Sequence, residues 1–309
     1  MSKSAFLFPG QGSQSVGMMT GFDSEIVRTT FEEASATLGY DLWDVTCNGP
    51  EERLGETRVT QPALLSAGIA TWRDWKESGG ADPDFLAGHS LGEYSALVAA
   101  GSLAFTDAVA LVAQRGELMQ QATPPGTGAM AAILGLDDEA LVAVCEDAAE
   151  GEVVSCANFN SPGQVVIAGT AKAVARASDA ALEAGARRAI PLAVSVPSHC
   201  MLMKPAADKL AIVLESMEIR NPEIPVLHNV DTAFAGSADE IRSALVNQLW
   251  MPVRWSETVR RLVDEEVGRF VECGPGKVLA GLNRRIFRGC ETIALTDTQT
   301  LKNMLDTWS

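Results

Sequence analysis

Short apolar runs alternate with longer amphipathic runs along most of this chain, and this alternation limits the possible folds more than any other feature. The apolar run Ser4–Pro9 is followed by Ser24–Leu38, in which apolar residues recur at every third or fourth position. Short apolar runs are typical of buried strands, and a repeat of about 3.6 residues is typical of amphipathic helices. Strands that alternate with helices predict an α/β fold with a parallel sheet.

The same two patterns continue on both sides of an interruption near the middle of the chain. Strands are predicted over 84–87 and 268–271. Helices are predicted over 62–78, 91–100, 106–122, 201–217, 239–249, 255–265 and 277–287. We expect these elements to form one hydrolase-like core with a parallel sheet, made of residues 1–125 and 196–309.

Within the interruption, which begins at Thr123–Gly128, the order of the elements changes. Strands are predicted over 129–134, 153–157, 164–168 and 187–192, with helices over 137–149 and 171–183, and with a turn at 160–163 between the two middle strands. The order β-α-β-β-α-β is that of the ferredoxin-like split unit. We therefore expect a small inserted subdomain at residues 126–195. A cleft between two subdomains is a common place for a ligand site.

Gly88–Gly92 fits the pattern Gly-X-Ser-X-Gly between a predicted strand and a predicted helix. In this context the pattern forms a tight turn that exposes a serine hydroxyl, here that of Ser90, for nucleophilic attack. Its glycines allow a sharp turn and leave room for a neighbouring element. The alternative is a plain strand-to-helix turn, because a pattern with three fixed positions also arises by chance.

The sequence contains only three histidines, so a base for Ser90 can be sought among few residues. His89 adjoins the serine on the tight turn, and we expect its side chain to point away from the hydroxyl. His228 ends an apolar run, which is typical of a structural histidine. His199 follows the insert directly and is the candidate general base at the seam of the two subdomains. The alternative for His199 is a histidine that packs beside the start of a helix.

Arg115 lies on the apolar face of the predicted helix 106–122, together with Ala108, Val112 and Met119. A buried guanidinium is costly unless an anion meets it. That anion is either a carboxylate of the protein or a carboxylate of a ligand. Arginine suits the second role because its planar fork binds a carboxylate through two hydrogen bonds.

The loop Gly10–Gln14 follows the first predicted strand and matches neither the P-loop nor the dinucleotide-binding glycine pattern. Such a loop can instead donate backbone N–H groups. In hydrolase-type sites one oxyanion donor is the amide after the serine, here Leu91, and a second comes from a loop after another strand. Gln11 is the candidate second donor. The alternative is a turn with no role in binding.

The charge and the cysteines limit the class of protein. A formal net charge of -16 and a pI of about 4.6 argue against binding to nucleic acids or anionic membranes, which need a positive face. The N-terminal apolar run is too short for a signal peptide, and no segment approaches the ~20 apolar residues of a membrane span. The six cysteines show no C-x-x-C spacing and are expected to be reduced. We expect a soluble, monomeric, cytoplasmic protein.

These segments together resemble the bacterial malonyl-CoA:acyl carrier protein transacylases of type II fatty-acid synthesis. The resemblance covers almost the whole chain. Eight segments match in order, namely 8–14, 60–63, 88–93, 114–116, 158–164, 196–199, 248–253 and 274–276. One five-residue motif is weak evidence, but eight motifs in the right order are strong evidence. An inserted ferredoxin-like subdomain is also a trait of this family.

The resemblance implies a role for each matching residue. Ser90 would be the nucleophile and His199 its base. The backbone N–H groups of Gln11 and Leu91 would bind the oxyanion. In this family a main-chain carbonyl, here at Gln248, orients the histidine in place of a carboxylate. Substrate binding would fall to Arg115, which would bind the malonyl carboxylate, and to the lesser pocket residues Gln61, Asn160 and Ser198.

The resemblance also implies malonyl-CoA and phosphopantetheinylated acyl carrier protein as the substrates, with no metal and no other cofactor. Acyl carrier proteins are acidic, as is this chain, so a local positive face is needed for binding. Residues 274–288 contain Lys277, Arg284 and Arg285 and no acidic residue. We expect this segment to bind the carrier protein. The alternative is a basic helix that is merely solvated.

Other functions remain open from the sequence. A serine esterase or thioesterase would need an acidic third catalytic residue and an apolar acyl pocket, which Arg115 disfavours. A non-catalytic scaffold that binds carrier proteins would not need a serine, a histidine and an arginine together. Relatives that serve polyketide synthesis or malonate decarboxylation would keep the same residues, so the sequence does not separate them from the fatty-acid enzymes.

Overall fold

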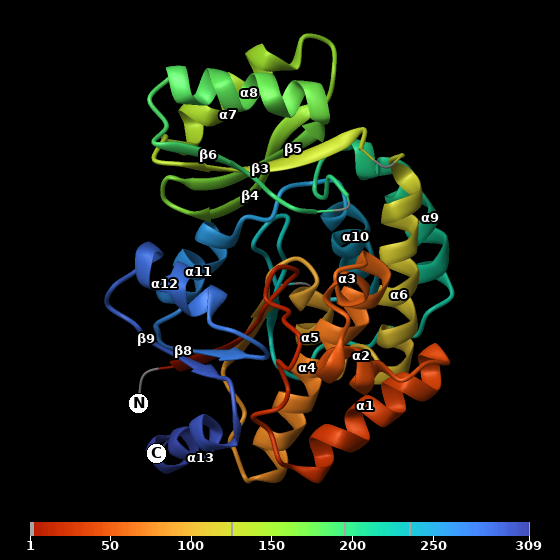
Figure 1. Ribbon diagram of the computed structural model, residues 1–309. Coiled ribbons are helices and arrows are strands. Elements are labelled where there is room, and N and C mark those ends of the chain that lie inside the picture. The colour runs from red at the N-terminus through yellow and green to blue at the C-terminus, as the bar shows by residue number, and fades with distance from the viewer. Residues whose placement is uncertain (1–2, 125, 195, 235, 309) are drawn as a thin grey trace.

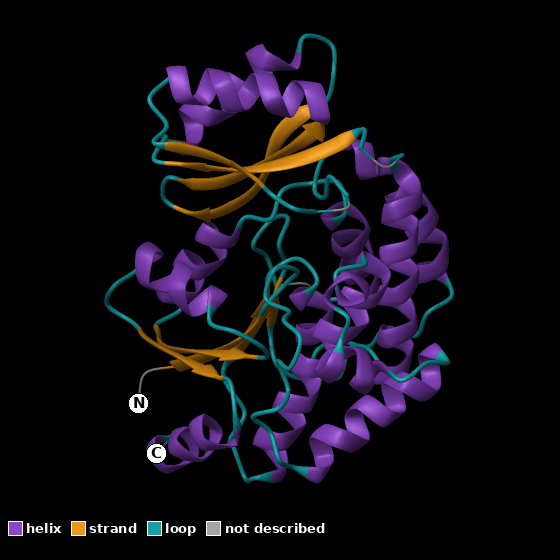
Figure 2. Cartoon of the chain, in the orientation of Figure 1, coloured by secondary structure: helices purple, strands orange, loops and turns teal. Residues whose placement is uncertain are grey.

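The computed structural model describes residues 3–124, 126–194, 196–234 and 236–308, which form two sheets with helices around them (Figure 2). The larger sheet has the strand order β7-β2-β1-β8-β9. Its strands are β1 (Lys3–Phe8), β2 (Phe85–Gly88), β7 (Val226–Leu227), β8 (Val267–Cys273) and β9 (Glu291–Leu295). Each neighbouring pair of these strands is parallel, as the alternation of strands and helices predicts.

Helices cover both faces of the parallel sheet (Figure 1). One face carries α11 (Trp255–Asp264) and α12 (Val278–Ile286). The other helices of this part are α1 (Glu25–Leu38), α2 (Leu42–Asn48), α3 (Glu51–Leu54), α4 (Thr57–Glu77), α5 (Gly92–Ala99), α6 (Phe105–Ala122), α9 (Lys204–Glu215), α10 (Ala238–Gln248) and α13 (Thr298–Thr307), with a 3-10 turn at Met201–Met203.

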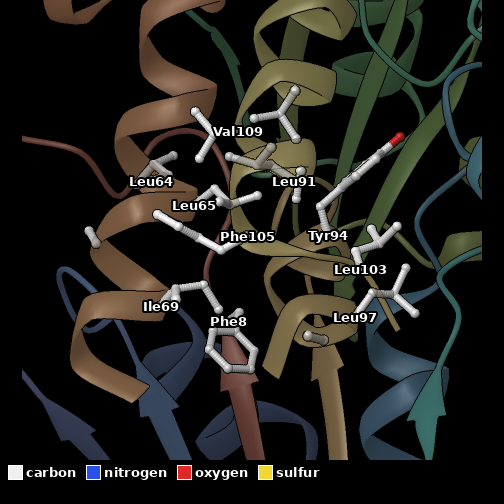
Figure 3. Close-up of a cluster of buried hydrophobic side chains, with 14 of the residues drawn as sticks. Phe8, Leu64, Leu65, Ile69, Leu91, Tyr94, Leu97, Leu103, Phe105 and Val109 are labelled. Atoms are coloured by element: carbon white, nitrogen blue, oxygen red, sulfur yellow. The ribbon is translucent and has the colours of Figure 1, made fainter. Parts of the chain in front are cut away.

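Alternate side chains of β1 enter different parts of the core, as the two-residue period of a strand requires. Phe6 and Phe8 belong to the larger apolar cluster, which α4, α5 and α6 also build. Figure 3 shows Phe8 at the base of this cluster, with Ile69 of α4 nearby. Ala5 and Leu7 pack instead with apolar residues of α11 and α12. Because both faces are covered, a strand of this sheet reads as a continuous apolar run.

The smaller sheet is antiparallel and lies beside the parallel core (Figure 1). Its strands β3 (Gly128–Leu134), β4 (Val154–Ser161), β5 (Gln164–Thr170) and β6 (Arg188–Pro191) have the order β4-β5-β3-β6. Helices α7 (Asp138–Ala149) and α8 (Ala171–Glu183) cover one face and share a separate apolar core with it. This is the ferredoxin-like arrangement, so the predicted fold class is confirmed. Residues 125 and 195, where two of the expected segments end, lie outside the described residues.

Apart from β7, which corresponds to the apolar run that ends at His228, four elements in the described part of the chain have no counterpart among the predicted ones. Helices α2 and α3 have seven and four residues, which is too short for a clear helical period. Helix α13 buries only Leu301 and Met304 among its described residues. Strand β9 lies at the edge of the parallel sheet, and its first residue, Glu291, is exposed. Weak or short apolar patterns explain why the sequence does not indicate these elements.

Most predicted boundaries differ from the structure by a few residues at most, but two differ by more than three. Helix α4 begins at Thr57 and not at Pro62, although proline favours the first turn of a helix. Burial of Val59 and the neighbouring residues offsets the backbone hydrogen bond that the proline cannot make. Strand β4 runs to Ser161, so Asn160 belongs to the strand and not to the turn. The turn shrinks to Pro162 and Gly163, whose φ of 68° suits a two-residue hairpin.

Backbone hydrogen bonds join the smaller sheet to the larger part of the molecule. The Phe159 N–H donates to the carbonyl of Val253 at 2.9 Å, and the Val253 N–H donates to the carbonyl of Ala157 at 2.9 Å. Val253 lies just after α10, so β4 is paired with the segment that follows this helix. The pairing brings Asn160 to the same cavity as the loops that follow β1 and β2.

Candidate active site

The turn between β2 and α5 holds Ser90 in an unusual backbone conformation. Ser90 has a φ of 51°, in the left-handed region that a serine rarely adopts. A Cβ atom at Gly88 would lie 1.9 Å from the carbonyl carbon of Gly92, and one at Gly92 would lie 2.0 Å from the carbonyl oxygen of Phe8. The glycines are therefore required by close packing, and the sharp bend itself falls on the serine. Strain of this kind is concentrated at functional sites.

Asn229 fixes this turn from the carboxyl end of β7. Its Oδ1 accepts a hydrogen bond from the Ser90 N–H at 2.7 Å, and its Nδ2 donates to the Gly88 carbonyl at 2.6 Å. The sequence analysis missed this residue. The available signal was its position, because polar residues directly after a strand of a parallel sheet often reach the site at that edge.

Ser90 and His199 form a hydrogen-bonded pair across 109 residues of sequence. The Ser90 Oγ lies 2.8 Å from Nε2 of His199, and Nδ1 of the same ring lies 2.7 Å from the carbonyl oxygen of Gln248. A carbonyl can only accept, so Nδ1 carries the proton and Nε2 is free to accept the serine O–H. The geometry is that of a nucleophile, its base and a group that orients the base.

His199 is buried, and its environment keeps the ring neutral. Burial in the apolar wall, followed by the positive charge of Arg115, lowers the pKa of His199 to about 3. A histidine must be neutral to accept a proton from a serine. At neutral pH the ring is therefore in the form that a general base requires.

Two backbone amides near Ser90 are free to bind an anion. Leu91 lies at the start of α5, and Gln11 lies in the loop after β1, which packs closely against the turn at Gly10. Among the described residues, neither amide donates a hydrogen bond to another part of the chain. Both residues line the same cavity as Ser90, as an oxyanion hole would require.

A cavity of about 440 Å³ lies between the two sheets. Predicted site residues that line it are Gln11, Ser90, Leu91, Arg115, Asn160, Ser198 and His199. Gln61 is not in this lining, because its side chain is buried against Met119, with Nε2 3.4 Å from the sulfur. Gln248 lies one layer behind the wall, where it contacts both His199 and Arg115.

Arg115 is 1% exposed and has no carboxylate partner among the described residues. Its Nη2 donates to Oε1 of Gln248 at 3.0 Å, and its guanidinium lies 5.3 Å from the centre of the Tyr94 ring. Burial raises the pKa of Tyr94 to about 12, so the phenol is neutral at pH 7 and supplies no anion. In the described part of the chain no protein carboxylate forms a direct ion pair with Arg115, although the charge of Glu93 acts on it from behind Gln248.

His89 turns away from the serine and toward the smaller sheet. Its Nε2 lies 2.8 Å from Oδ1 of Asn160, which belongs to β4. Its ring packs against Trp255 at 5.5 Å. The contact bridges the two parts of the molecule directly beside the nucleophile and fixes one side of the cavity.

Basic residues lie on α12 and directly before it, next to residues that line the cavity. Lys277, Arg284 and Arg285 are exposed, whereas Val278 and Leu282 of the same segment line the cavity. Arg285 hydrogen-bonds the side chain of Gln164, and Arg284 donates to a backbone carbonyl of β9. Arg285 is thus tied to a residue of the cavity lining, whereas Arg284 is tied to the edge strand of the parallel sheet.

The cysteines, the possible metal ligands and the lengths of the helices also bear on the sequence expectations. All six cysteines are free, as expected for a reduced chain. Within the described ranges, no group of three or more histidine, cysteine or acidic side chains is placed to hold a metal ion. No helix in that part of the chain has the length and apolar character needed to cross a bilayer.

The chain matches the family model of the acyl transferase domain over residues 5–297. The malonyl CoA-acyl carrier protein transacylase of Escherichia coli (strain K12) is 54% identical over 99% of this chain and 100% of its own length. The enzyme of the same name from Haemophilus influenzae is 57% identical over 96% of each chain.

Solved structures agree with these relatives. An acyl carrier protein S-malonyltransferase from Vibrio cholerae superposes with a TM-score of 0.96 and 55% identity, over 98% of this chain and 100% of that one. A malonyl-transacylase in complex with a type II PKS acyl-carrier protein has a TM-score of 0.98 and 55% identity, over 99% and 100% of the two chains. The chain therefore belongs to the acyl transferase family and, within it, to the malonyl-CoA:acyl carrier protein transacylases.

Proposed function

We propose that this protein moves a malonyl group from malonyl-CoA to the phosphopantetheine thiol of acyl carrier protein through an ester on Ser90. The observation that carries the proposal is Arg115, a buried guanidinium without a described carboxylate partner that lines the same cavity as the Ser90–His199 pair. A malonyl group has a thioester carbonyl for the serine and a free carboxylate for the arginine. An arginine fork binds such a carboxylate through two hydrogen bonds.

In the first half of the reaction, His199 accepts the proton of Ser90 as its Oγ attacks the thioester carbonyl carbon. The carbonyl oxygen becomes an oxyanion, and the amides of Gln11 and Leu91 donate hydrogen bonds to it. One such donor is typically worth about 3–4 kcal/mol in the transition state. The carbon–sulfur bond then breaks, the proton passes from His199 to the sulfur, and CoA leaves as a thiol.

The second half runs the same steps in reverse order with a new thiol. The phosphopantetheine thiol gives its proton to His199 and attacks the malonyl ester. The tetrahedral intermediate uses the same two amides, and its collapse returns the proton to Ser90 Oγ. Because each substrate meets the enzyme in turn, the kinetics are ping-pong. No step needs a metal or a redox cofactor.

The roles of the remaining residues follow from their positions. The Gln248 carbonyl orients His199, and Asn160 and Ser198 shape the malonyl pocket. Gln61 supports this pocket through Met119. Lys277, Arg284 and Arg285 attract the acidic carrier protein to the mouth of the cavity.

The same proposal covers the organisation and the location of the chain. Residues 1–125 and 196–309 act as the catalytic subdomain, and residues 126–195 form the small subdomain that closes the other side of the cavity. Six unpaired cysteines fit a cytoplasmic enzyme.

A transfer assay tests the proposal. Purified protein is incubated with malonyl-, methylmalonyl- or acetyl-CoA and with a phosphopantetheinylated carrier protein, and mass spectrometry follows the acyl group. We expect malonyl-carrier as the main product, with a malonyl adduct on Ser90 before the carrier is added. A Ser90→Ala variant should form neither. Release of free malonate in place of transfer would identify a thioesterase, and full biological function of Ser90→Ala would identify a scaffold.

A further inference from the structure

Glu93 is a fully buried carboxylate that lies just behind the catalytic pair. It belongs to the first turn of α5, three residues after the nucleophile, and its side chain is 0% exposed. Its two oxygens have different partners. Oε1 lies 2.6 Å from Nδ1 of His228, whereas Oε2 accepts from the Asn229 N–H at 3.1 Å and from Nε2 of Gln248 at 2.7 Å.

The contact with Glu93 sets the orientation of the Gln248 side chain. Nε2 of Gln248 donates to Glu93 Oε2 and, at 2.9 Å, to the carbonyl oxygen of Ser90. Both partners are acceptors, so this end of the amide must be the NH₂ group. A flipped amide would place its oxygen against a carboxylate and a carbonyl, which is strongly unfavourable in a buried site.

The orientation of the Gln248 amide determines which of its atoms faces Arg115. With Nε2 turned toward Glu93, Oε1 of Gln248 faces the guanidinium and accepts from Nη2 at 3.0 Å. In the flipped state an NH₂ group would face the guanidinium and push it away. One edge of the guanidinium is thereby fixed to the wall through Nη2. Nε is buried without a hydrogen-bond partner in the described part of the chain, and Arg115 lines the cavity, where a ligand can reach it.

We propose that Glu93 is a positioning residue for malonyl selection, which acts through the Gln248 amide to aim Arg115 at the substrate carboxylate. The inference rests on the proposed malonyl transfer. Glu93 does not touch substrate, and its effect passes through two successive hydrogen bonds. Gln248 thereby serves both halves of the site, since its carbonyl orients His199 and its side chain orients Arg115.

His228 has a separate part in this network. Its Nδ1 contacts Oε1 of Glu93, whereas Gln248 contacts Oε2. His228 thus fixes the carboxylate of Glu93, and Gln248 is oriented by it. A change at His228 that keeps a donor for Oε1 should leave the Gln248 contact intact, which makes this residue the matched control.

The experiment compares kcat/KM for malonyl-CoA with kcat/KM for acetyl-CoA, which lacks the carboxylate. Glu93→Met removes the acceptor, and Glu93→Asp keeps the charge but withdraws the carboxylate from Gln248 by about 1.5 Å, one carbon–carbon bond. In both variants we expect the malonyl-to-acetyl ratio to fall by about tenfold or more, the size expected for a hydrogen bond to a charged group. Glu93→Gln retains an acceptor for Gln248 and should stay within about threefold of the wild-type ratio.

Two further variants separate positioning from mere stabilisation. Gln248→Met keeps the carbonyl for His199 but loses the amide, and it should lower the ratio as Glu93→Met does. The double variant should lower it no further, because both changes break the same chain of contacts. His228→Asn, whose amide can replace Nδ1, should keep the ratio within about threefold.

The outcomes distinguish this inference from the proposed function. A wild-type enzyme that does not prefer malonyl-CoA would contradict the proposed function itself. If the wild type prefers malonyl-CoA and both activities of Glu93→Asp fall in parallel with an unchanged ratio, Glu93 has only a structural role and the inference is wrong. Glu93→Asp decides the question if Glu93→Met does not fold.

Discussion

The guanidinium of Arg115 acts on the imidazole of His199, because after burial its charge is the largest influence that lowers the pKa of this histidine. The residue proposed to select the substrate would thus also set the strength of the proposed base. A carboxylate bound to Arg115 offsets the positive charge. We therefore expect His199 to become a stronger base when a malonyl group is in place and to stay weak when the pocket holds none.

The first prediction concerns the pH dependence of kcat/KM for malonyl-CoA. An ordinary histidine has a pKa of 6.5, and here burial and Arg115 lower the value to about 3. His199 is active when neutral, so a lowered pKa keeps the enzyme active as the pH falls. Activity should stay level from pH 8 down to about pH 5, with no loss centred near 6.5. A loss centred there would contradict the burial of the ring in the free enzyme.

Removal of the Arg115 charge should shift the acidic side of the pH profile. In Arg115→Gln the pKa of His199 should rise, so activity toward acetyl-CoA should begin to fall at a higher pH than in the wild type. Arg220→Gln is the matched control, since Arg220 is exposed and its pair with Glu218 is on the surface. The control should leave the profile in place.

The second prediction concerns substrate choice by Arg115. Arg115→Ala removes the only charge-bearing contact proposed for the malonyl carboxylate. We expect kcat/KM for malonyl-CoA to fall by about 100-fold or more, as for loss of one partner of a buried ion pair. Activity toward uncharged acyl-CoAs should rise relative to malonyl-CoA. Steady-state kinetics with both substrates measures the ratio, and an unchanged ratio would exclude the arginine as the selecting group.

Loss of this arginine should also increase hydrolysis. We expect the bound carboxylate and the narrow cavity to leave no room for an attacking water. In Arg115→Ala a larger share of the acyl-serine should then react with water, which release of free acid in the absence of carrier protein reports. Equal hydrolysis by the wild type and the variant would show that another part of the site protects the ester.

The third prediction concerns Asn229, which holds the strained turn at Ser90. Asn229→Ala leaves the Ser90 N–H and the Gly88 carbonyl without their partner. The free energy of unfolding should decrease by about 1–3 kcal/mol, the cost of a buried polar group left unpaired, and kcat should fall as the serine loses its fixed position. Urea denaturation and a transfer assay measure the two effects. Asn303→Ala, an exposed asparagine on α13, should change the free energy of unfolding by less than about 0.5 kcal/mol.

The fourth prediction concerns the carrier protein. Arg285 contacts Gln164 in the cavity lining, so Lys277→Glu combined with Arg284→Glu is the cleaner test of the basic face. The KM for carrier protein should rise, most clearly at low salt, and the KM for malonyl-CoA should change by less than about twofold. Lys209→Glu combined with Arg220→Glu, two exposed residues away from the cavity lining, serves as a charge-matched control. Equal effects on both substrates would mean that these residues bind CoA or support the pocket.

The alternating strands and helices of the fold could be predicted from the sequence, and so could site residues that are rare in number or unusual in their position. Alternation of strands and helices indicated the parallel sheet, and the β-α-β-β-α-β order indicated the insert. Only three histidines had to be considered as the base, and the Gly-X-Ser-X-Gly pattern identified Ser90 as the candidate nucleophile. Arg115 was recognisable because a charge on an apolar helical face needs an explanation. Each of these signals is local in sequence.

The features that the sequence did not predict depend on contacts between distant segments. Asn229 and Glu93 act through hydrogen bonds to residues far away along the chain. The position of Asn229 after a short strand is its only local signal, and nothing in the neighbourhood of Glu93 marks its contacts. The position of Gln61 behind Met119 depends on how α4 packs against α6. The start of α4 at Thr57 depends on tertiary burial, which outweighed the local preference of proline for a first turn.

The stretch from Gln248, the last residue of α10, to Val253 is attached to the rest of the molecule at two points, which has a consequence for evolution. At Gln248 it supplies the carbonyl that holds His199, and at Val253 its backbone is paired with β4 of the smaller sheet. The catalytic base and the far wall of the cavity are therefore tied to one short stretch of backbone. An insertion or deletion between these two residues would displace one or the other, so new acyl specificities in this fold are expected to arise by exchange of side chains and not by changes in the length of this segment.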